Sequence, residues 1–294
     1  MSESKGNTLD PIISRRVMEF LQEDLGSGDI TTDAVIERDA YAEARIICRE
    51  DAVISGVEEA ILIFNLLKCS VKDLVKEGDT VEAGNTILKV NGNARSILKG
   101  ERTALNILGR MSGVATETKR LVKEAIKGNP KIRVAATRKT LPGFRLFDKK
   151  AGYSGGGDTH RFRLDDAVLI KDNHIKIAGS AAKAVQLAKK GVSFTKKIEV
   201  EASSYDEALE AVEAGADIVM LDNMNPQEVS RVVKALEERR IRDRVFLEAS
   251  GKISVENVKR YSEAGVDAVS SGGITHSAKS IDFSLEIIGK KEVG

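Results

Sequence analysis

The chain has 294 residues, 41% hydrophobic and 31% charged, a composition that excludes a disordered chain and allows one large or two ordinary domains. Its 46 Lys and Arg residues nearly balance 45 Asp and Glu residues, which argues against the basic surplus typical of nucleic-acid-binding proteins. No run approaches the about 18 apolar residues of a membrane span, and the N-terminus lacks a signal-like apolar core. We therefore expect a cytoplasmic protein that binds neither membranes nor nucleic acid.

The first part of the chain, residues 1–115, predicts an α/β domain. A helix is expected over PIISRRVMEFLQEDL, with Asp10 as its N-cap and Pro11 as its first residue. The following stretch, GSGDITTDA, is rich in turn-forming residues.

Strand-like segments come next. They are YAEARIICRED and VKEGDTVEAGNTILKV, and turns are expected at Gly78-Asp79 and Gly84-Asn85. From Ser96 onwards, ILKGERTALNILGRMSGVATETKRLVKEAI predicts a long helix.

Residues 116–275 show short apolar runs that alternate with amphipathic helices. The runs are IRVAATRK, DAVLIKDNH, KIEVEAS, DIVMLDN, RVFLEASG and DAVSSGG. One helix is expected to open at Asn225-Pro226, with Glu228 completing a capping box, and another to open at Ser254 and end at Gly265. Alternation of this kind is typical of parallel β/α units.

The predicted fold class is α/β, with an atypical, incomplete parallel α/β barrel joined to an N-terminal sandwich-like α/β domain. EAGADIVMLDN and EAGVDAVSSGG repeat one unit of helix end, Gly turn and strand. A doubly wound sheet is the alternative, but it would gather polar residues near one switch point rather than at every strand end. Six strands are visible where a full barrel has eight.

Polar residues follow each strand, and parallel strands end at one face of a barrel. They are Arg138, Lys139, Lys171, Asp172, Asn173, His174, Glu199, Glu201, Asp222, Asn223, Glu248, Ser250, Ser271, Gly272 and Gly273. Several cations, separated carboxylates that suit Mg²⁺ and Gly-rich turns that suit phosphate indicate a substrate with carboxylates, a phosphate and a pyrophosphate.

Each of these residues also has a structural interpretation. A single Lys or Arg at a strand end is most often a solvated charge. Glu199 and Glu201 are two residues apart and share one face, where they could form an interior ion pair. His160 alone would be structural, and Gly272-Gly273 could be a tight turn. The repetition of polar residues at successive strand ends favours a site.

TRKTLPGFR, followed by GGGDTHRFRLDDAVLIKDNH, closely resembles the quinolinate phosphoribosyltransferase family. The resemblance runs nearly end to end, through EDLGSGDITTDA, GERTALNILGRMSGVAT, EVEASS, MLDN, EASG and SSGGITHSA. It implies an N-terminal domain that the C-terminal tail, residues 276–294, rejoins. It also implies Mg²⁺-dependent transfer from phosphoribosyl pyrophosphate to quinolinate with loss of CO₂, in NAD biosynthesis, by a homodimer or a larger assembly.

The resemblance also implies roles for particular residues. Arg102 matches an arginine lent across the dimer to quinolinate. Arg138, His160 and Arg161 match residues that hold quinolinate within one subunit, and Thr137 is expected to be a further substrate-binding residue. Lys139 and Lys171 match lysines near the reacting centre, and Glu201 and Asp222 match carboxylates that address Mg²⁺ and the ribose. The 5′-phosphate loops match Ser250, Gly251, Ser271, Gly272 and Gly273. Lys252 departs from the glycine that is usual there.

Other functions stay open at this point. A molybdenum-transport-associated paralogue would be expected to lack KDNH, which this chain has at Lys171–His174. Nicotinate phosphoribosyltransferase takes a monocarboxylate, which the surplus of arginines disfavours. A catalytically silent barrel that binds phosphorylated ligands would be expected to have lost one of Lys139, Lys171, Glu201 or Asp222.

Overall fold

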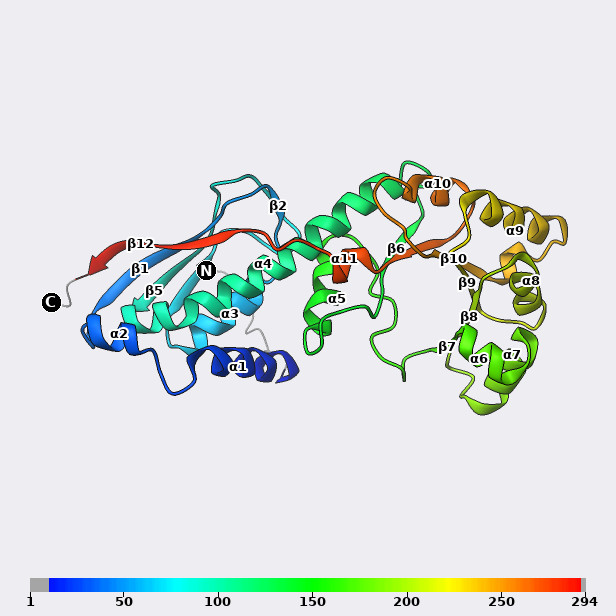
Figure 1. The fold of residues 1–294 in the computed structure, drawn as a ribbon. Coiled ribbons are helices and arrows are strands. Elements are labelled where there is room, and N and C mark those ends of the chain that lie inside the picture. The colour runs from blue at the N-terminus through cyan, green and yellow to red at the C-terminus, as the bar shows by residue number, and fades with distance from the viewer. Residues whose placement is uncertain (1–10, 292–294) are drawn as a thin grey trace, which may run out of the picture. The chain divides into compact units, whose positions relative to one another are not determined.

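The structure, a computed structural model, describes residues 11–291. The chain divides into two compact units: the first runs to Gly113 and resumes at Lys279, and the second is Val114–Ala278 (Figure 1). The expected N-cap at Asp10 and the last tail residues, 292–294, lie outside the described residues. Between residues 11 and 291, each helix is too short or too polar to span a bilayer.

An antiparallel sheet with the strand order β12-β1-β5-β3 forms the centre of the first unit. The tail strand β12 (Phe283–Lys291) pairs along all of β1 (Tyr41–Cys48), so the end of the chain belongs to the same sheet as its beginning. The other elements are α1 (Pro11–Leu25), α2 (Ile30–Val35), β2 (Ala52–Val53), α3 (Val57–Leu66), β3 (Ser70–Asp73), β4 (Thr80–Val81) and β5 (Thr86–Asn93). The long helix α4 (Ala94–Ala125) contains the boundary between the units.

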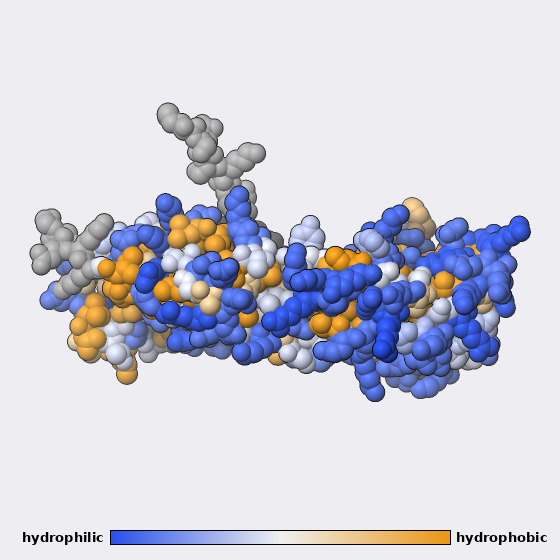
Figure 2. Space-filling model, turned by 90° about the horizontal axis from the view of Figure 1, so that it is seen from above, coloured by the Kyte–Doolittle hydropathy of each residue, from blue (hydrophilic) through white to orange (hydrophobic). Residues whose placement is uncertain are grey.

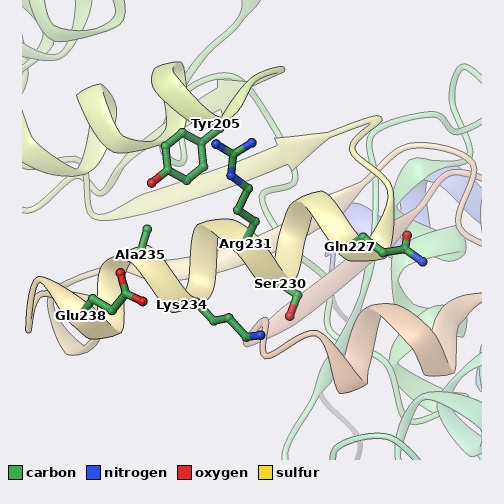
Figure 3. Close-up of a pocket in the computed structure, with 7 residues that line it drawn as sticks. All are labelled: Tyr205, Gln227, Ser230, Arg231, Lys234, Ala235 and Glu238. Carbon is green, nitrogen blue, oxygen red and sulfur yellow. The ribbon is translucent and has the colours of Figure 1, made fainter.

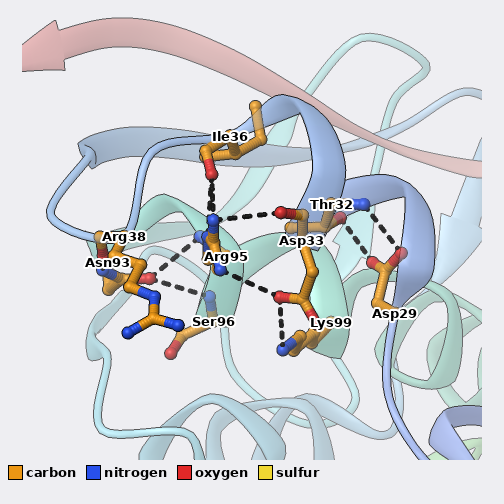
Figure 4. A network of polar contacts seen from close by, with 9 residues as sticks. All are labelled: Asp29, Thr32, Asp33, Ile36, Arg38, Asn93, Arg95, Ser96 and Lys99. Carbon is orange, nitrogen blue, oxygen red and sulfur yellow. Dashed lines mark hydrogen bonds and ion pairs between the residues drawn. The ribbon is translucent and has the colours of Figure 1, made fainter.

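The stretch predicted as turns, GSGDITTDA, contains part of the short helix α2, so this prediction is corrected. The Asp29 carboxylate caps the helix by accepting the Thr32 N–H at 2.9 Å. Arg95 on α4 donates to the Ile36 carbonyl at 2.8 Å and pairs with Asp33 at 3.1 Å (Figure 4). Because α4 supplies these contacts, the local sequence gives no signal for them.

Six parallel strands form the sheet of the second unit, in the order β6-β11-β10-β9-β8-β7. They are β6 (Arg133–Ala136), β7 (Val168–Ile170), β8 (Ile198–Ala202), β9 (Ile218–Asp222), β10 (Phe246–Ser250) and β11 (Ala268–Ser271). Strands consecutive from β7 to β11 are neighbours, and β11 then returns to the first strand, β6. The order closes like a barrel except between β6 and β7, which confirms the predicted incomplete barrel.

Helices connect the strands of the second unit and bury their apolar faces against the sheet. They are α5 (Arg145–Ser154), α6 (Asp172–Ala178), α7 (Ala181–Gly191), α8 (Tyr205–Glu213), α9 (Pro226–Glu238), the 3₁₀ turn η1 (Arg242–Arg244), α10 (Val258–Glu263) and α11 (Gly273–His276). Val219 and Leu247 in the strands and Leu236 on α9 are fully buried. This core leaves the carboxyl ends of the strands to carry polar groups.

The helix start predicted at Asn225 is confirmed, and the one predicted at Ser254 is wrong. The Asn225 side chain accepts the Glu228 N–H while the Glu228 carboxylate accepts the Asn225 N–H, a complete capping box. The Ser254 N–H instead donates to the Asn257 side chain at 2.9 Å, and α10 begins only at Val258. Gly265 follows α10 with φ +94°, as its predicted place at the helix end requires.

We predict that Asn225→Ala lowers the free energy of unfolding by about 1 kcal/mol, because the first turn of α9 loses its side-chain cap. The urea midpoint of the variant measures this change. Gln227→Ala, in the same exposed turn but without a capping side chain, serves as the control. Equal midpoints for both variants would contradict a stabilising cap.

Candidate active site

A cavity of about 610 Å³ lies within the second unit. We call it the strand-end cavity, because its lining comes mainly from residues at or just beyond the carboxyl ends of the parallel strands. They are Thr137, Arg138, Lys139, His160, Arg161, Leu169, Lys171, Glu201, Met220, Asp222, Asn223, Glu248, Ser250, Gly251, Lys252 and Ser270.

Parallel strands explain why residues so far apart in the chain meet in this cavity. Thr137 directly follows β6 and Lys171 directly follows β7, while Glu201, Asp222 and Ser250 lie at the ends of β8, β9 and β10. Since all these strands run in one direction, their ends share one face. The structure thus brings together most of the residues that the sequence singles out.

The cations of the cavity have few anionic partners. The Arg138 Nε–H is buried and donates to no acceptor among the described residues. Arg161 donates to the Ala167 carbonyl at 3.1 Å, and burial together with the neighbouring Arg138 lowers its pKa. An anionic ligand would satisfy the buried Arg138 donor and offset the repulsion between the two guanidinium groups.

The two carboxylates expected near a metal, those of Glu201 and Asp222, lie on the neighbouring strands β8 and β9. The Glu201 carboxylate accepts a short contact from the Lys171 ammonium, and the Asp222 carboxylate accepts the Asn223 side-chain N–H at 2.7 Å. Both carboxylates also line an adjoining hollow of about 440 Å³ with Asp172, Ser203 and other residues. A cation held by these two carboxylates could therefore take further ligands from the strand-end cavity or from the adjoining hollow.

The turn after β10 has a left-handed backbone at two successive residues, Gly251 and Lys252. Gly251 has φ +100°, and a Cβ there would lie 2.5 Å from the Asn223 Oδ1. Lys252, which departs from the family pattern, adopts φ +50°, a conformation that costs a non-glycine residue about 1 kcal/mol. The turn keeps its left-handed geometry despite the lysine, and the lysine lines the strand-end cavity.

The residues expected in a second phosphate turn, Ser271, Gly272 and Gly273, lie behind the cavity lining. The Ser271 hydroxyl donates to the Ile253 carbonyl at 2.8 Å. A Cβ on Gly272 would lie 2.8 Å from the Lys139 Cδ, and the Thr275 hydroxyl donates to the Lys139 carbonyl at 2.8 Å. This segment packs against Lys139, and Ser270 is the residue of β11 that reaches the cavity.

Arg102 belongs to a different part of the chain. It lies on α4 within the first unit, and its side chain is exposed.

His160, Glu199 and Glu248 form a cluster that the sequence did not predict as a unit, and two of them, His160 and Glu248, line the cavity. The His160 Nε2 is 3.5 Å from a Glu199 oxygen and 3.3 Å from a Glu248 oxygen. The two glutamates are only 1% and 2% exposed. A signal existed, because Glu248 precedes Ser250 by two residues, as Glu199 precedes Glu201, and so faces the same side of its strand.

The ring of His160 holds its proton between the two carboxylates. Its Nδ1 accepts the Arg161 backbone N–H at 2.8 Å, so the ring proton lies on Nε2. Burial lowers the pKa of His160, but hydrogen bonds to Glu199 and Glu248 outweigh it and raise the pKa above its ordinary value, so Nε2 keeps its proton. Burial, and then the charge of Glu248, raises the pKa of Glu199.

These three residues are the one group in the described part of the chain whose ligand atoms are close enough for a three-ligand metal site. The protonated Nε2 argues against that use, since a metal requires the lone pair of this nitrogen. We interpret the cluster as a hydrogen-bonded support for the base of the cavity.

A further hollow of about 490 Å³ runs along α9, where the Arg231 guanidinium lies 4.5 Å from the centre of the Tyr205 ring (Figure 3). Its lining includes Gln227, Ser230 and Lys234, and it contains none of the strand-end residues. The strand-end cavity is the better candidate, because it gathers cations, carboxylates and Gly turns from several strands.

Comparisons with known proteins agree with this geometry. Residues 114–286 match the family description "Quinolinate phosphoribosyl transferase, C-terminal domain", and residues 29–112 match the corresponding N-terminal domain. A probable carboxylating nicotinate-nucleotide pyrophosphorylase from Methanothermobacter thermautotrophicus is 47% identical over 94% of this chain and 99% of its own length. The carboxylating nicotinate-nucleotide pyrophosphorylase of Rattus norvegicus is 37% identical over 93% of this chain and 90% of its own length.

A solved structure shows the same fold. The nicotinate-nucleotide pyrophosphorylase from Francisella tularensis superimposes with a TM-score of 0.88 at 39% identity. The match covers 98% of this chain and 100% of that chain.

We predict that His160→Asn lowers the free energy of unfolding by about 3 kcal/mol at pH 7, since it leaves two buried carboxylates without their shared N–H donor. Asparagine tolerates the left-handed backbone at this position, where φ is +50°. Urea unfolding measures the loss, and adding Glu199→Gln to His160→Asn should recover part of it. A double variant no more stable than His160→Asn would rule out carboxylate repulsion as the cause.

Proposed function

The chain belongs to the quinolinate phosphoribosyl transferase family, and we propose that it transfers the phosphoribosyl group of phosphoribosyl pyrophosphate to quinolinate. The products are nicotinate mononucleotide, CO₂ and pyrophosphate, and the reaction serves NAD biosynthesis in the cytoplasm. The observation that carries this proposal is the cationic strand-end cavity with the buried, unpartnered Nε of Arg138. Quinolinate is a dianion and its partner a polyanion, so both substrates require such a cavity.

In this proposal the cations divide between the two substrates. Arg138 and Arg161 bind the quinolinate carboxylates, for which the planar guanidinium fork is suited. Lys139, Lys171 and Lys252 face the phosphates, with the backbone of Ser250–Lys252 around the 5′-phosphate. Holding both anions in one cavity aligns the pyridine nitrogen with the ribose and supplies much of the rate enhancement.

The chemistry then requires charge stabilisation rather than a covalent nucleophile. The pyridine nitrogen forms a bond to ribose C1 as the bond to pyrophosphate breaks, and positive charge develops on the ribose. Glu201 and Asp222 stabilise that charge, and Lys139 and Lys171 neutralise the leaving pyrophosphate. The bond between C2 and its carboxylate breaks next, and CO₂ leaves. The electron pair stays on C2, beside the positively charged ring nitrogen, until C2 takes a proton from solvent.

Mg²⁺ fits the carboxylates of the cavity. Glu201 and Asp222 offer oxygen ligands from neighbouring strands, and both face two adjoining hollows. Two carboxylates do not fill the coordination shell of Mg²⁺, so phosphate oxygens of the substrate would supply further ligands. The ion would in turn balance the charge of the phosphates. Lys171, which contacts Glu201, would exchange that contact for phosphate when the substrate and ion bind.

We further propose a homodimer in which the partner subunit lends its copy of Arg102 to quinolinate. The exposure of Arg102 on α4 leaves its guanidinium available for such a contact. Large apolar side chains are exposed on the first unit, among them Ile12, Met18, Ile30 and Val35. Figure 2 shows hydrophobic surface on this unit, at the left of the view. A second copy of the chain would cover apolar surface of this kind.

We predict that purified protein with quinolinate, phosphoribosyl pyrophosphate and Mg²⁺ releases nicotinate mononucleotide and CO₂ in equal amounts. Chelation of Mg²⁺ should stop both products. Parallel reactions contain nicotinate in place of quinolinate. Product from nicotinate would assign the chain to the non-decarboxylating reaction, and no product from either acid would favour a paralogue or a binding protein.

We predict that Arg102→Ala weakens quinolinate binding roughly ten-fold or more while phosphoribosyl pyrophosphate binding changes less, because a charge-assisted hydrogen bond to one substrate is lost. Titration calorimetry with each substrate measures the difference. Arg110→Ala, a half-buried arginine on the same helix, is the matched control. Equal losses for both substrates would contradict the role of Arg102.

A further inference from the structure

A buried lysine that the proposed mechanism does not use lies beside the strand-end cavity. Lys149 on α5 is 0% exposed, although lysine is rarely fully buried. Its helix packs directly against the end of β6, since a Cβ on Gly152 would lie 3.5 Å from the Ala136 Cβ. The position of Lys149 therefore needs an explanation in terms of what its ammonium group contacts.

The Lys149 ammonium donates to three backbone carbonyls. The acceptors are Ala136 at 2.7 Å, Arg161 at 3.0 Å and Thr159 at a shorter contact. An ammonium has three N–H donors, so each is used. The centre of the Phe162 ring lies 5.7 Å from the ammonium nitrogen, and these three hydrogen bonds go to carbonyls rather than to a carboxylate.

These three carbonyls belong to the two segments that bring cations into the cavity. Ala136 directly precedes Thr137, Arg138 and Lys139, and the other two carbonyls flank His160. The first segment follows β6, and the second approaches from the opening between β6 and β7. One side chain thus ties the backbone next to Arg138 to the backbone of Arg161, the two arginines proposed above to bind one dicarboxylate.

The charges around Lys149 make this contact sensitive to pH. Its own helix contributes Arg145, the segment after β6 contributes Arg138, and the segment before β7 contributes Asp158 and Arg161. Burial, and then the nearby Arg145, lowers the pKa of Lys149 to about 8. The ammonium loses one of its three N–H donors as pH rises through this value.

We propose that Lys149 is a positioning residue that sets the spacing of Arg138 and Arg161 for a dicarboxylate. The proposal rests on the function proposed above, but the contacts that carry it are independent of any substrate. Lysine suits this role better than a neutral residue, because its three donors match three carbonyls and its charge adds to the positive potential of the cavity.

The test compares Lys149→Met, which replaces the apolar part of the side chain but removes the ammonium donors, with Lys150→Met on the same helix. Hydrogen exchange of the unliganded protein should be faster in residues 137–139 and 159–161 of Lys149→Met and unchanged in Lys150→Met. Quinolinate affinity should fall roughly ten-fold or more, as for the loss of hydrogen bonds to a charged group, while phosphoribosyl pyrophosphate affinity changes less than about two-fold. If Lys149→Met does not fold, Lys149→Gln, which keeps two donors, should show the same losses to a smaller extent.

The pH dependence distinguishes positioning from simple stability. Because the folded pKa of about 8 lies below the ordinary 10.5, the folded protein binds fewer protons between these values. Lys149 therefore makes stability rise with pH across this window, while quinolinate affinity should fall. Both trends should be weaker in Lys149→Met. Unchanged exchange and affinity in a folded Lys149→Met, or equal losses for both substrates, would overturn the proposal, whereas wild-type protein that makes no product would overturn only the proposed function.

Discussion

Concentrated positive charge with few carboxylate partners is the constraint on which the rest of the second unit depends. Arg138 and Arg161 repel each other in the same cavity, and the Nε of Arg138 has no partner in the described residues. Such an arrangement costs stability in the free protein. An anionic ligand in the cavity would offset this cost, as the proposed function requires.

Two carboxylates of the second unit, those of Glu199 and Glu248, are buried more deeply than the cations of the cavity. Glu199 and Glu248 face the interior, where the His160 ring contacts both. Glu201 lies two residues further along the same strand and reaches the cavity beside Lys171. The period of two along β8 therefore places Glu199 in the interior and Glu201 in the lining of the cavity.

The sequence predicts those features that depend on interactions between residues close together in the chain. The six strands, the capping box at Asn225 and the polar residues at strand ends follow from local patterns that the structure reproduces. It does not predict the contacts that Arg95, on a distant helix, makes with Asp33 and Ile36 beside the locally capped α2. Nor does it predict the partners of His160 or Lys149, which lie on strands and turns far away in the chain. Side-chain burial of a charge depends on tertiary packing, and a sequence pattern of lysines and glutamates cannot distinguish buried from solvated ones.

The incompleteness of the barrel and the presence of the site have one origin. In a closed barrel β6 would pair with β7, whereas here the free edge of β6 pairs at a single point with Asp158, whose N–H donates to the Val134 carbonyl at 2.7 Å. That bridge stops the pairing and directs the next residues, His160 and Arg161, across the strand ends. A seventh or eighth strand in the opening would occupy the hydrogen-bonding edge that Asp158 uses. The opening is therefore the feature that allows a second cationic segment to share a cavity with the one after β6, and closing it would displace His160 and Arg161 from the cavity lining.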